Sequence, residues 1–248
     1  WLRGVQNTRW PLYFTLAGVI PVAILIPVLV ARYGLEGSAM ANVIGLTITS
    51  VCFLVALHRE HEGSWAPQWS IMKRQLVMGR DLILRSLSFQ VAFVSAAAVA
   101  ARFGTSSLAA HQIMLQLWNF ITLVLDSLAI AAQALTGAAL GRGTVGVAKQ
   151  VGVRVTVYSM VFAGALGLVF AVLAGVIPRI FTRDADVLAT LSTPWWLMII
   201  MIVLGGVVFA LDGVLLGAGD AAYLRTITIA SVLIGFLPGV WISYAVDG

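Results

Sequence analysis

Charged side chains are scarce in this sequence: of its 248 residues, 60% are hydrophobic and only 10% are charged. A soluble domain usually carries about 25% charged residues, and the mean hydropathy of this chain is +1.00. Too few polar side chains are present to cover the surface that a soluble protein of this length exposes to water. The composition therefore excludes an ordinary soluble domain and indicates a membrane protein.

Cysteine is also nearly absent. Cys52 is the single one and lies in an apolar run, so no intrachain disulfide can form and we predict a small buried residue. The sequence has no P-loop lysine motif, which excludes direct coupling to ATP within this chain. His58 and His61 lie in a run of charged residues that is typical of a solvated loop. With neither a nucleophile–base pair nor a metal cluster in the apolar segments, we predict a protein that is not an enzyme and holds no metal or cofactor.

The net charge of +5 does not indicate a nucleic-acid partner. The Lys and Arg residues form no basic stripe and lie between apolar runs, as the cations that flank membrane segments do. The predicted partner of the chain's surface is therefore membrane lipid.

Long apolar runs dominate what is present. A membrane-spanning helix needs about 20 mostly apolar residues, and the sequence supplies seven such segments. We predict an all-α polytopic membrane protein with spans at residues 12–33, 38–57, 82–103, 107–140, 155–177, 187–216 and 222–246. The longest polar connection, residues 58–81, is the predicted linker between a two-helix part (1–57) and a five-helix part (82–248).

Proline and tryptophan mark particular places in these spans. Four prolines fall inside them, at Pro21, Pro27, Pro194 and Pro238, where we expect kinks because neighbouring groups can satisfy the freed carbonyls. Trp195 and Trp196 lie near the outer end of their span, and we predict that they anchor it at the membrane interface.

The basic residues indicate the orientation of the spans. If residues 1–11 face the cytoplasm, then the linker 58–81 and the connections 141–154 and 217–221 also do. Eleven of the fifteen Lys and Arg residues then lie in or near the inner side, as the positive-inside rule requires. Only four lie near the outer side: Arg32, Arg102, Arg179 and Arg183.

A similar turn occurs twice in the chain. Residues 1–12 read "WLRGVQNTRWPL" and residues 215–225 read "LLGAGDAAYLR", and in both a polar, glycine-containing turn precedes an apolar helix. Both turns fall on the predicted cytoplasmic side. Their spacing suits a parallel repeat of about six helices, an arrangement found in transporters.

Several ordered motifs extend this observation: "LRGVQNTRWPLYF", "GLEGSAMANVIG", "FGTSSLAAHQI", "LDSLAIAAQALTGAALGRG" and "LDGVLLGAGDAAYLR". Together they resemble the multidrug and toxic-compound extrusion (MATE) family, in particular its branch named for a DNA-damage-inducible protein. The resemblance implies two six-helix lobes that export cationic or amphipathic compounds from the cell, in exchange for H⁺ or Na⁺.

The resemblance also implies which part of such a transporter is present. The seven spans correspond to helices five to eleven of twelve, so the first four helices and the last are expected to be missing. Residues 1–57 would end the N-terminal lobe, 58–81 would link the lobes in the cytoplasm, and 82–248 would form most of the C-terminal lobe. The complete protein is expected to be a monomer in the cell membrane.

Polar residues of the span 107–140 share one helical face. At 100° per residue they fall within an arc of about 100°, and they are Gln112, Gln116, Asn119, Asp126 and Gln133. Such residues either form hydrogen bonds between helices or line a hydrated cavity. The carboxylate at mid-span favours the cavity.

Three titratable residues are candidates for ion or proton coupling. Asp126 lies deep in its span, where desolvation favours a neutral carboxyl and suits a proton carrier, although a permanent pair with a buried Arg is an equal alternative. His111 is a candidate proton relay, with a packing role as the alternative. Asp212 lies at the same depth as Arg85, and the two are a candidate structural ion pair; Arg85 could instead extend its side chain to the interface.

Taken with the resemblance, these features favour a secondary antiporter that exports amphipathic or cationic drugs by alternating access. The alternative within the same superfamily is a flippase for lipid-linked oligosaccharides or lipids, whose phosphate cargo would require a cavity rich in Arg and Lys. The polar face of the span 107–140 is neutral or acidic, which disfavours that alternative.

Overall fold

The computed structural model describes residues 7, 9–60 and 66–247 of the chain. It divides into two compact units, residues 1–68 and residues 69–248, which are described separately. Among the described residues, seven helices are long and apolar enough to cross a membrane. The chain is thus an all-α, multi-pass membrane protein. Most of the first copy of the repeated turn (residues 1–6 and 8) lies outside the described residues, as does His61.

The first unit is a pair of helices, α1 (Arg9–Tyr33) and α2 (Leu35–Glu60), which pack along each other. Gly34 joins them with a φ of 58°, a left-handed conformation that glycine adopts without strain. Farther along the pair, a Cβ atom on Gly18 would overlap Thr49 and the carbonyl of Gly45. Small residues therefore let the two backbones approach closely, as is common between membrane helices.

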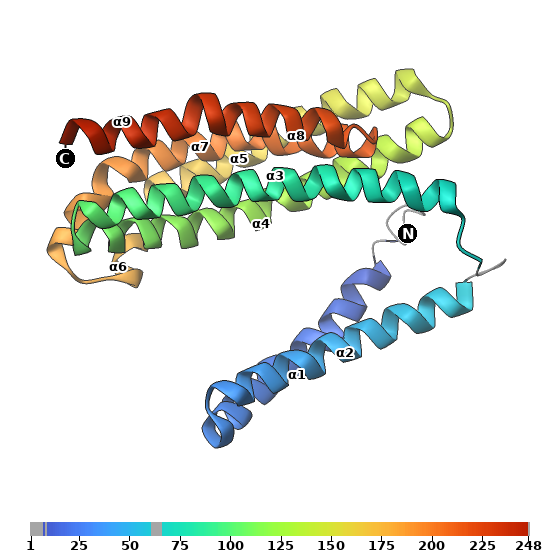
Figure 1. Cartoon of the computed structure of the whole chain (residues 1–248), viewed down its shortest axis with the longest axis horizontal. Helices are drawn as coiled ribbons and strands as arrows, with labels where there is room; N and C mark the ends of the chain where they lie inside the picture. The colour runs from blue at the N-terminus through green and yellow to red at the C-terminus, as the bar shows by residue number, and fades with distance from the viewer. Residues whose placement is uncertain (1–6, 8, 61–65, 248) are drawn as a thin grey trace. The chain divides into compact units, whose positions relative to one another are not determined.

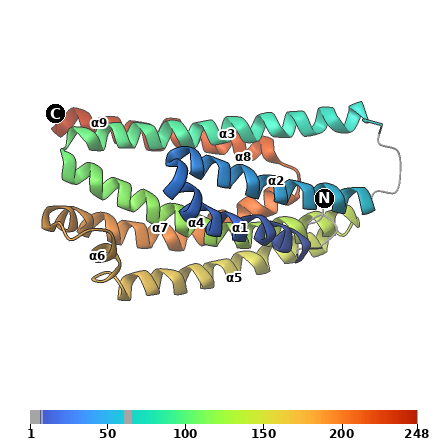
Figure 2. The same ribbon diagram turned by 90° about the horizontal axis from the view of Figure 1, so that it is seen from below.

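The second unit contains the remaining spans (Figures 1 and 2). Its elements are α3 (Trp69–Arg102), α4 (Thr105–Gly141), α5 (Val145–Val172), the short α6 (Ile177–Phe181), α7 (Ala185–Gly217), and a last span made of α8 (Ala221–Ala230), the π-helix η1 (Ser231–Phe236) and α9 (Leu237–Asp247). Asp184 and Asp220 cap α7 and α8 by accepting hydrogen bonds from backbone N–H groups of the first turn.

The centre of this unit is the contact of α4 and α5 with α7. Its core cluster takes side chains from all three helices: Leu117, Ile121, Leu125, Ala163, Phe170, Trp195, Met198 and Ile202. Trp195 is 2% exposed, stacks on Phe170 and donates a hydrogen bond of 3.2 Å from Nε1 to the Phe170 carbonyl. The prediction that Trp195 anchors the span at the interface is therefore wrong, whereas Trp196 is 56% exposed.

Glycines bring α7 close to both of its neighbours. A Cβ on Gly213 would overlap the backbone of Ala129 in α4, and a Cβ on Gly206 would overlap Ala163 and the Ser159 backbone in α5. Backbone atoms cannot move aside as the end of a flexible side chain can. We therefore expect α7 to tolerate no larger residue at either position.

Gly213→Ala should lower the stability of the protein by about 3 kcal/mol, the upper end of the usual cost of overpacking a core. Gly164→Ala in α5 is the matched control, because its added Cβ would have nothing within 4 Å. The control should be neutral or more stable by up to about 1 kcal/mol, since alanine favours the helix. Denaturant titration in detergent measures both; equal stability of the two variants would contradict the tight α4–α7 contact.

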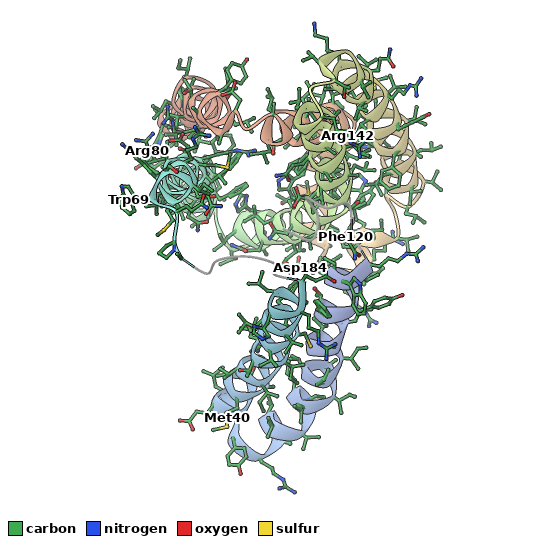
Figure 3. All side chains as sticks on the ribbon, turned by 90° about the vertical axis from the view of Figure 1, so that its right-hand side faces the viewer. Met40, Trp69, Arg80, Phe120, Arg142 and Asp184 are labelled. Atoms are coloured by element: carbon green, nitrogen blue, oxygen red, sulfur yellow. The ribbon has the colours of Figure 1, made fainter. Side chains whose placement is uncertain are left out.

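The other side of the second unit is formed by α3, which packs along the last span and contacts α4. Figure 3 views the unit from the end where α3 begins, with Trp69 and Arg80 labelled there. The helix starts at Trp69, although the predicted span starts at residue 82. Residues 69–81, expected in the linker, include Lys, Arg, Gln, Leu and Met, which favour helix even where they are too polar for the membrane interior.

The start of α5 and the interior of the last span also differ from the sequence prediction. The helix α5 begins at Val145 instead of residue 155, again because basic residues reduce the hydropathy of a segment without preventing helix formation. The last span widens into the π-helix η1 just before Pro238. Proline has no N–H for the carbonyl four residues back, and here the Leu237 N–H donates to Val232, five residues back. By contrast, α1 continues across Pro21 and Pro27.

Candidate functional site

A pocket of about 590 Å³ opens between α3, α4 and α7. We call it the carboxylate pocket because it contains two carboxylates beside one guanidinium. Its polar lining residues are Arg85, Asn119, Thr122, Asp126 and Asp212. Aromatic and aliphatic side chains form the rest of the wall, among them Phe89, Phe93, Trp118, Met201 and Phe209. The pocket thus holds a few polar groups in an otherwise apolar setting, as small-molecule and ion sites commonly do.

Arg85 of α3 and Asp212 of α7 form a two-point ion pair in this pocket. Arg85 Nη1 donates to Asp212 Oδ2 at 3.1 Å, and Nη2 lies 2.6 Å from Oδ1. The two side chains are 19% and 14% exposed, so solvent screens the pair only partly. The guanidinium also lies 5.7 Å from the centre of the Phe89 ring. The contact expected from equal depth is present; its structural role stays a prediction.

Asp126 of α4 lies in the same pocket and close enough to Asp212 for their charges to interact. Among the described residues, no ion pair forms with Asp126. Because Arg85 already neutralises Asp212, the second carboxylate leaves the pocket with one net negative charge when it is ionised. One proton or one monovalent cation at Asp126 would balance that charge.

The remaining members of the polar face of α4 lie in different surroundings. Asn119 lines the carboxylate pocket beside Asp126. Gln112, Gln116 and Gln133 do not line that pocket, although all five residues of the face are exposed. For these three glutamines, a cavity-lining role stays a prediction.

His111 is not brought together with the two carboxylates. It lines a second pocket of about 360 Å³, which we call the histidine pocket and which lies nearer the start of α4. The histidine pocket shares Phe93, Trp118 and Met201 with the carboxylate pocket. The structure thus divides the three candidate coupling residues between two adjoining spaces.

A second charge cluster escaped the sequence analysis. Asp81 of α3 is 4% exposed at its side chain and lies 2.7 Å from Arg225 Nη1 of α8 and 2.9 Å from Arg80 Nη2. Arg80 and Arg225 were predicted only as inner-side cations. A usable signal was present, since Asp81 is the one acidic residue in α3 and a carboxylate in an apolar helix requires a partner. The cluster ties α3 to the last span.

Within residues 9–60 and 66–247, no group of three or more His, Cys, Asp or Glu side chains is placed to hold a metal ion. The carboxylate pocket, with its single unpaired carboxylate, is therefore the arrangement with the clearest chemical capacity.

Comparison with known proteins extends these observations. The MatE family model matches residues 82–241. Protein DETOXIFICATION 44, chloroplastic, of Arabidopsis thaliana is 29% identical over 98% of this chain and 47% of its own length. DNA damage-inducible protein F of Escherichia coli is 27% identical over 95% of this chain and 53% of its own length.

Solved structures show the same fold. An outward-facing multidrug resistance MATE family transporter of the MOP superfamily superposes with a TM-score of 0.85 at 18% identity, over 98% of this chain and 60% of that one. The chain spans about half the length of the curated relatives given above.

Proposed function

The chain belongs to the MatE family of transporters, and from this premise we propose that it is part of a secondary antiporter. The complete protein would export amphipathic or cationic organic compounds across the cell membrane in exchange for H⁺ or Na⁺. Its first unit would end the N-terminal lobe and its second unit would form most of the C-terminal lobe. We expect the complete transporter to be monomeric, with membrane lipid as its surroundings.

The carboxylate pocket carries this proposal. Asp212 is held by Arg85 at two points, so the guanidinium balances its negative charge. Asp126 lines the same pocket with no described ion pair, so it is the group whose charge can change. In general, a carboxylate binds a proton or Na⁺ more strongly where water is excluded than where water has access.

Alternating access would use this difference. When the pocket faces the side of high cation concentration, Asp126 takes up the cation, and substrate release is favoured. When it faces the other side, Asp126 gives up the cation and the substrate can bind again. Each step shifts a population only as far as the ligand binds one state better than the other.

The flippase alternative has less support. Phosphate groups are bound by Arg and Lys side chains that are free to donate. In the carboxylate pocket, Arg85 is the one basic lining residue described, and its guanidinium is already paired with Asp212. The pocket therefore suits a cation better than a phosphate.

The test is transport by the complete protein in proteoliposomes, with a proton gradient and a Na⁺ gradient imposed separately. We expect one gradient to drive uptake of a fluorescent organic cation and substrate to drive flux of that same ion. Transport that neither gradient alters would contradict the antiport proposal. Transport of a phospholipid analogue instead of the organic cation would favour the flippase.

A further inference from the structure

A third pocket lies on another flank of α7 than the carboxylate and histidine pockets. It measures about 330 Å³ and is formed by the α5–α6 connection, α6 and the first half of α7, so we call it the α6 pocket. At 100° per residue, its lining residues on α7 are turned roughly 140° away from those of the other two pockets. The transport proposal therefore does not use this side of the helix. The α7 residues that line the α6 pocket are Leu188, Leu191, Ser192, Trp195 and Trp196.

The α6 pocket lies at the end of two membrane spans. The helix α6 connects α5 to α7, at the end of the second unit away from the start of α3 (Figure 1). Its side chains Ile180 and Phe181 are exposed, as is Val176 just before it. Trp196 is also exposed, and tryptophan is enriched where the headgroups of a bilayer meet the acyl chains. We therefore expect the pocket to lie at headgroup depth, in the outer leaflet if the predicted orientation holds.

Three exposed side chains of the α6 pocket can bind a polar ligand. Arg179 of α6 forms no ion pair with any described residue. The two acidic residues that follow it, Asp184 and Asp186, do not line the pocket. The Ser192 hydroxyl donates to a carbonyl of its own helix at 2.8 Å, which leaves the oxygen able to accept. The indole N–H of Trp196 is a third polar group, and it can only donate.

We propose that the α6 pocket binds the headgroup of phosphatidylethanolamine. The phosphate would accept hydrogen bonds from the Arg179 guanidinium, whose planar fork matches two phosphate oxygens. The ethanolamine nitrogen would donate to Ser192 Oγ, and the Trp196 indole would lie along the ester region with its N–H toward an oxygen. Phosphatidylcholine has the same net charge but no N–H to donate, so it should bind more weakly. This site goes beyond the proposed function, because its ligand is neither the exported compound nor the coupling ion.

The surroundings of the pocket favour a lipid over a soluble phosphate. Apolar side chains of the α5–α6 connection and of α6 are exposed next to the lining residue Arg179, among them Val176 and Ile180. A soluble anion would leave them uncovered, whereas the acyl chains of a phospholipid would cover them. Burial of apolar surface is favourable by about 25 cal/mol per Å². A ligand that joins a phosphate to acyl chains thus satisfies both parts of this surface.

The experiment titrates phosphatidylethanolamine and phosphatidylcholine with matched acyl chains into the complete transporter in detergent. Native mass spectrometry gives the dissociation constant of the first bound lipid. Loss of a hydrogen bond between charged groups should weaken binding about tenfold, so we expect this loss for both lipids in Arg179→Gln. Arg183→Gln is the matched control, because it removes the same charge from an exposed position that does not line the pocket. The control should leave both constants unchanged.

Ser192→Ala tests the choice of headgroup. It removes the acceptor for the ethanolamine N–H and should reduce the affinity for phosphatidylethanolamine to that for phosphatidylcholine. Ser88→Ala is the control, since Ser88 is an exposed serine of α3 with the same kind of hydrogen bond to its own helix, 2.9 Å long. It lies outside the α6 pocket and should leave the ratio of the two constants unchanged.

Equal lipid affinity in Arg179→Gln and Arg183→Gln would overturn the inference. So would an unchanged preference in Ser192→Ala, or displacement of the lipid by inorganic phosphate, which would identify a site for a soluble anion. None of these results bears on ion coupling, which is measured by flux. Conversely, failure of the antiport test would leave a lipid preference measured here in place.

Discussion

Asp126→Asn in the complete transporter should abolish cation-driven export, reducing it to the level of protein-free liposomes. Asparagine keeps the size and polarity of the side chain but cannot take up or release a proton and carries no charge to attract Na⁺. Substrate binding should survive and lose its dependence on pH, because the group that exchanges the proton is gone. Substrate-driven proton or sodium flux in proteoliposomes measures the first effect, and substrate binding across a pH series measures the second.

Asp186→Asn is the matched control for this prediction. It removes the same charge from an exposed position in the first turn of α7, outside the carboxylate pocket, and should leave flux intact. If Asp126→Asn still exchanges substrate for the cation at the normal rate, the coupling group lies elsewhere, for example in the other lobe. Membrane insertion and detergent stability of the variant should match those of the unaltered protein.

Arg85→Gln and Asp212→Asn should each destabilise the protein strongly, by about 3–5 kcal/mol, because each leaves its partner's charge buried and unpaired. The double variant should lose less stability than either single variant, since neither of the two positions then carries a buried charge that has lost its partner. A double-mutant cycle in detergent, followed by chemical denaturation, gives the coupling free energy of the pair. We expect a large coupling free energy because the Arg85 guanidinium contacts both carboxylate oxygens of Asp212, at 3.1 and 2.6 Å.

A second cycle provides the comparison. Arg179→Gln with Asp186→Asn neutralises two charges for which no mutual ion pair is described, and its coupling energy should be near zero. Additive losses at Arg85 and Asp212 would show that their contact contributes no stability.

The sequence predicted the existence of the helices better than their ends. Hydrocarbon thickness sets a minimum apolar length, so seven runs of that length gave seven spans. The same criterion started the third span at residue 82, whereas α3 begins at Trp69. Hydropathy records where a helix enters lipid, and the backbone can remain helical beyond that point.

Helical phase predicted a shared face on α4 but not what covers it. Asn119 and Asp126 lie on that face and line the carboxylate pocket, whereas Gln133 does not line it, although all three residues are exposed. The neighbours of a face depend on how other helices pack, which the pattern of one helix does not contain. For the same reason Trp195, at a position suited to an interfacial anchor, turned out to fill the core.

Two opposite charges at the same depth in different spans are a usable signal of an ion pair. It indicated Arg85 with Asp212, and the contact is present. The same argument applied to Asp81 and Arg225 would have indicated their contact of 2.7 Å. It was missed because basic residues at the inner end of a span already have an explanation in the positive-inside rule.

The ion pair of Asp81 has a consequence for biosynthesis. Asp81 and Arg225 are 144 positions apart, so at roughly 5–20 residues per second the ribosome needs about 7–30 s to supply the arginine after the aspartate. During that interval the neighbouring residue Arg80 can provide the positive charge that pairs with Asp81. Asp212 likewise follows Arg85 by 127 positions, so it is also synthesised later than its partner. We therefore expect α3 to settle fully into the bilayer only once α7 and α8 have left the translocon, which makes the last span of the second unit the one that completes its assembly.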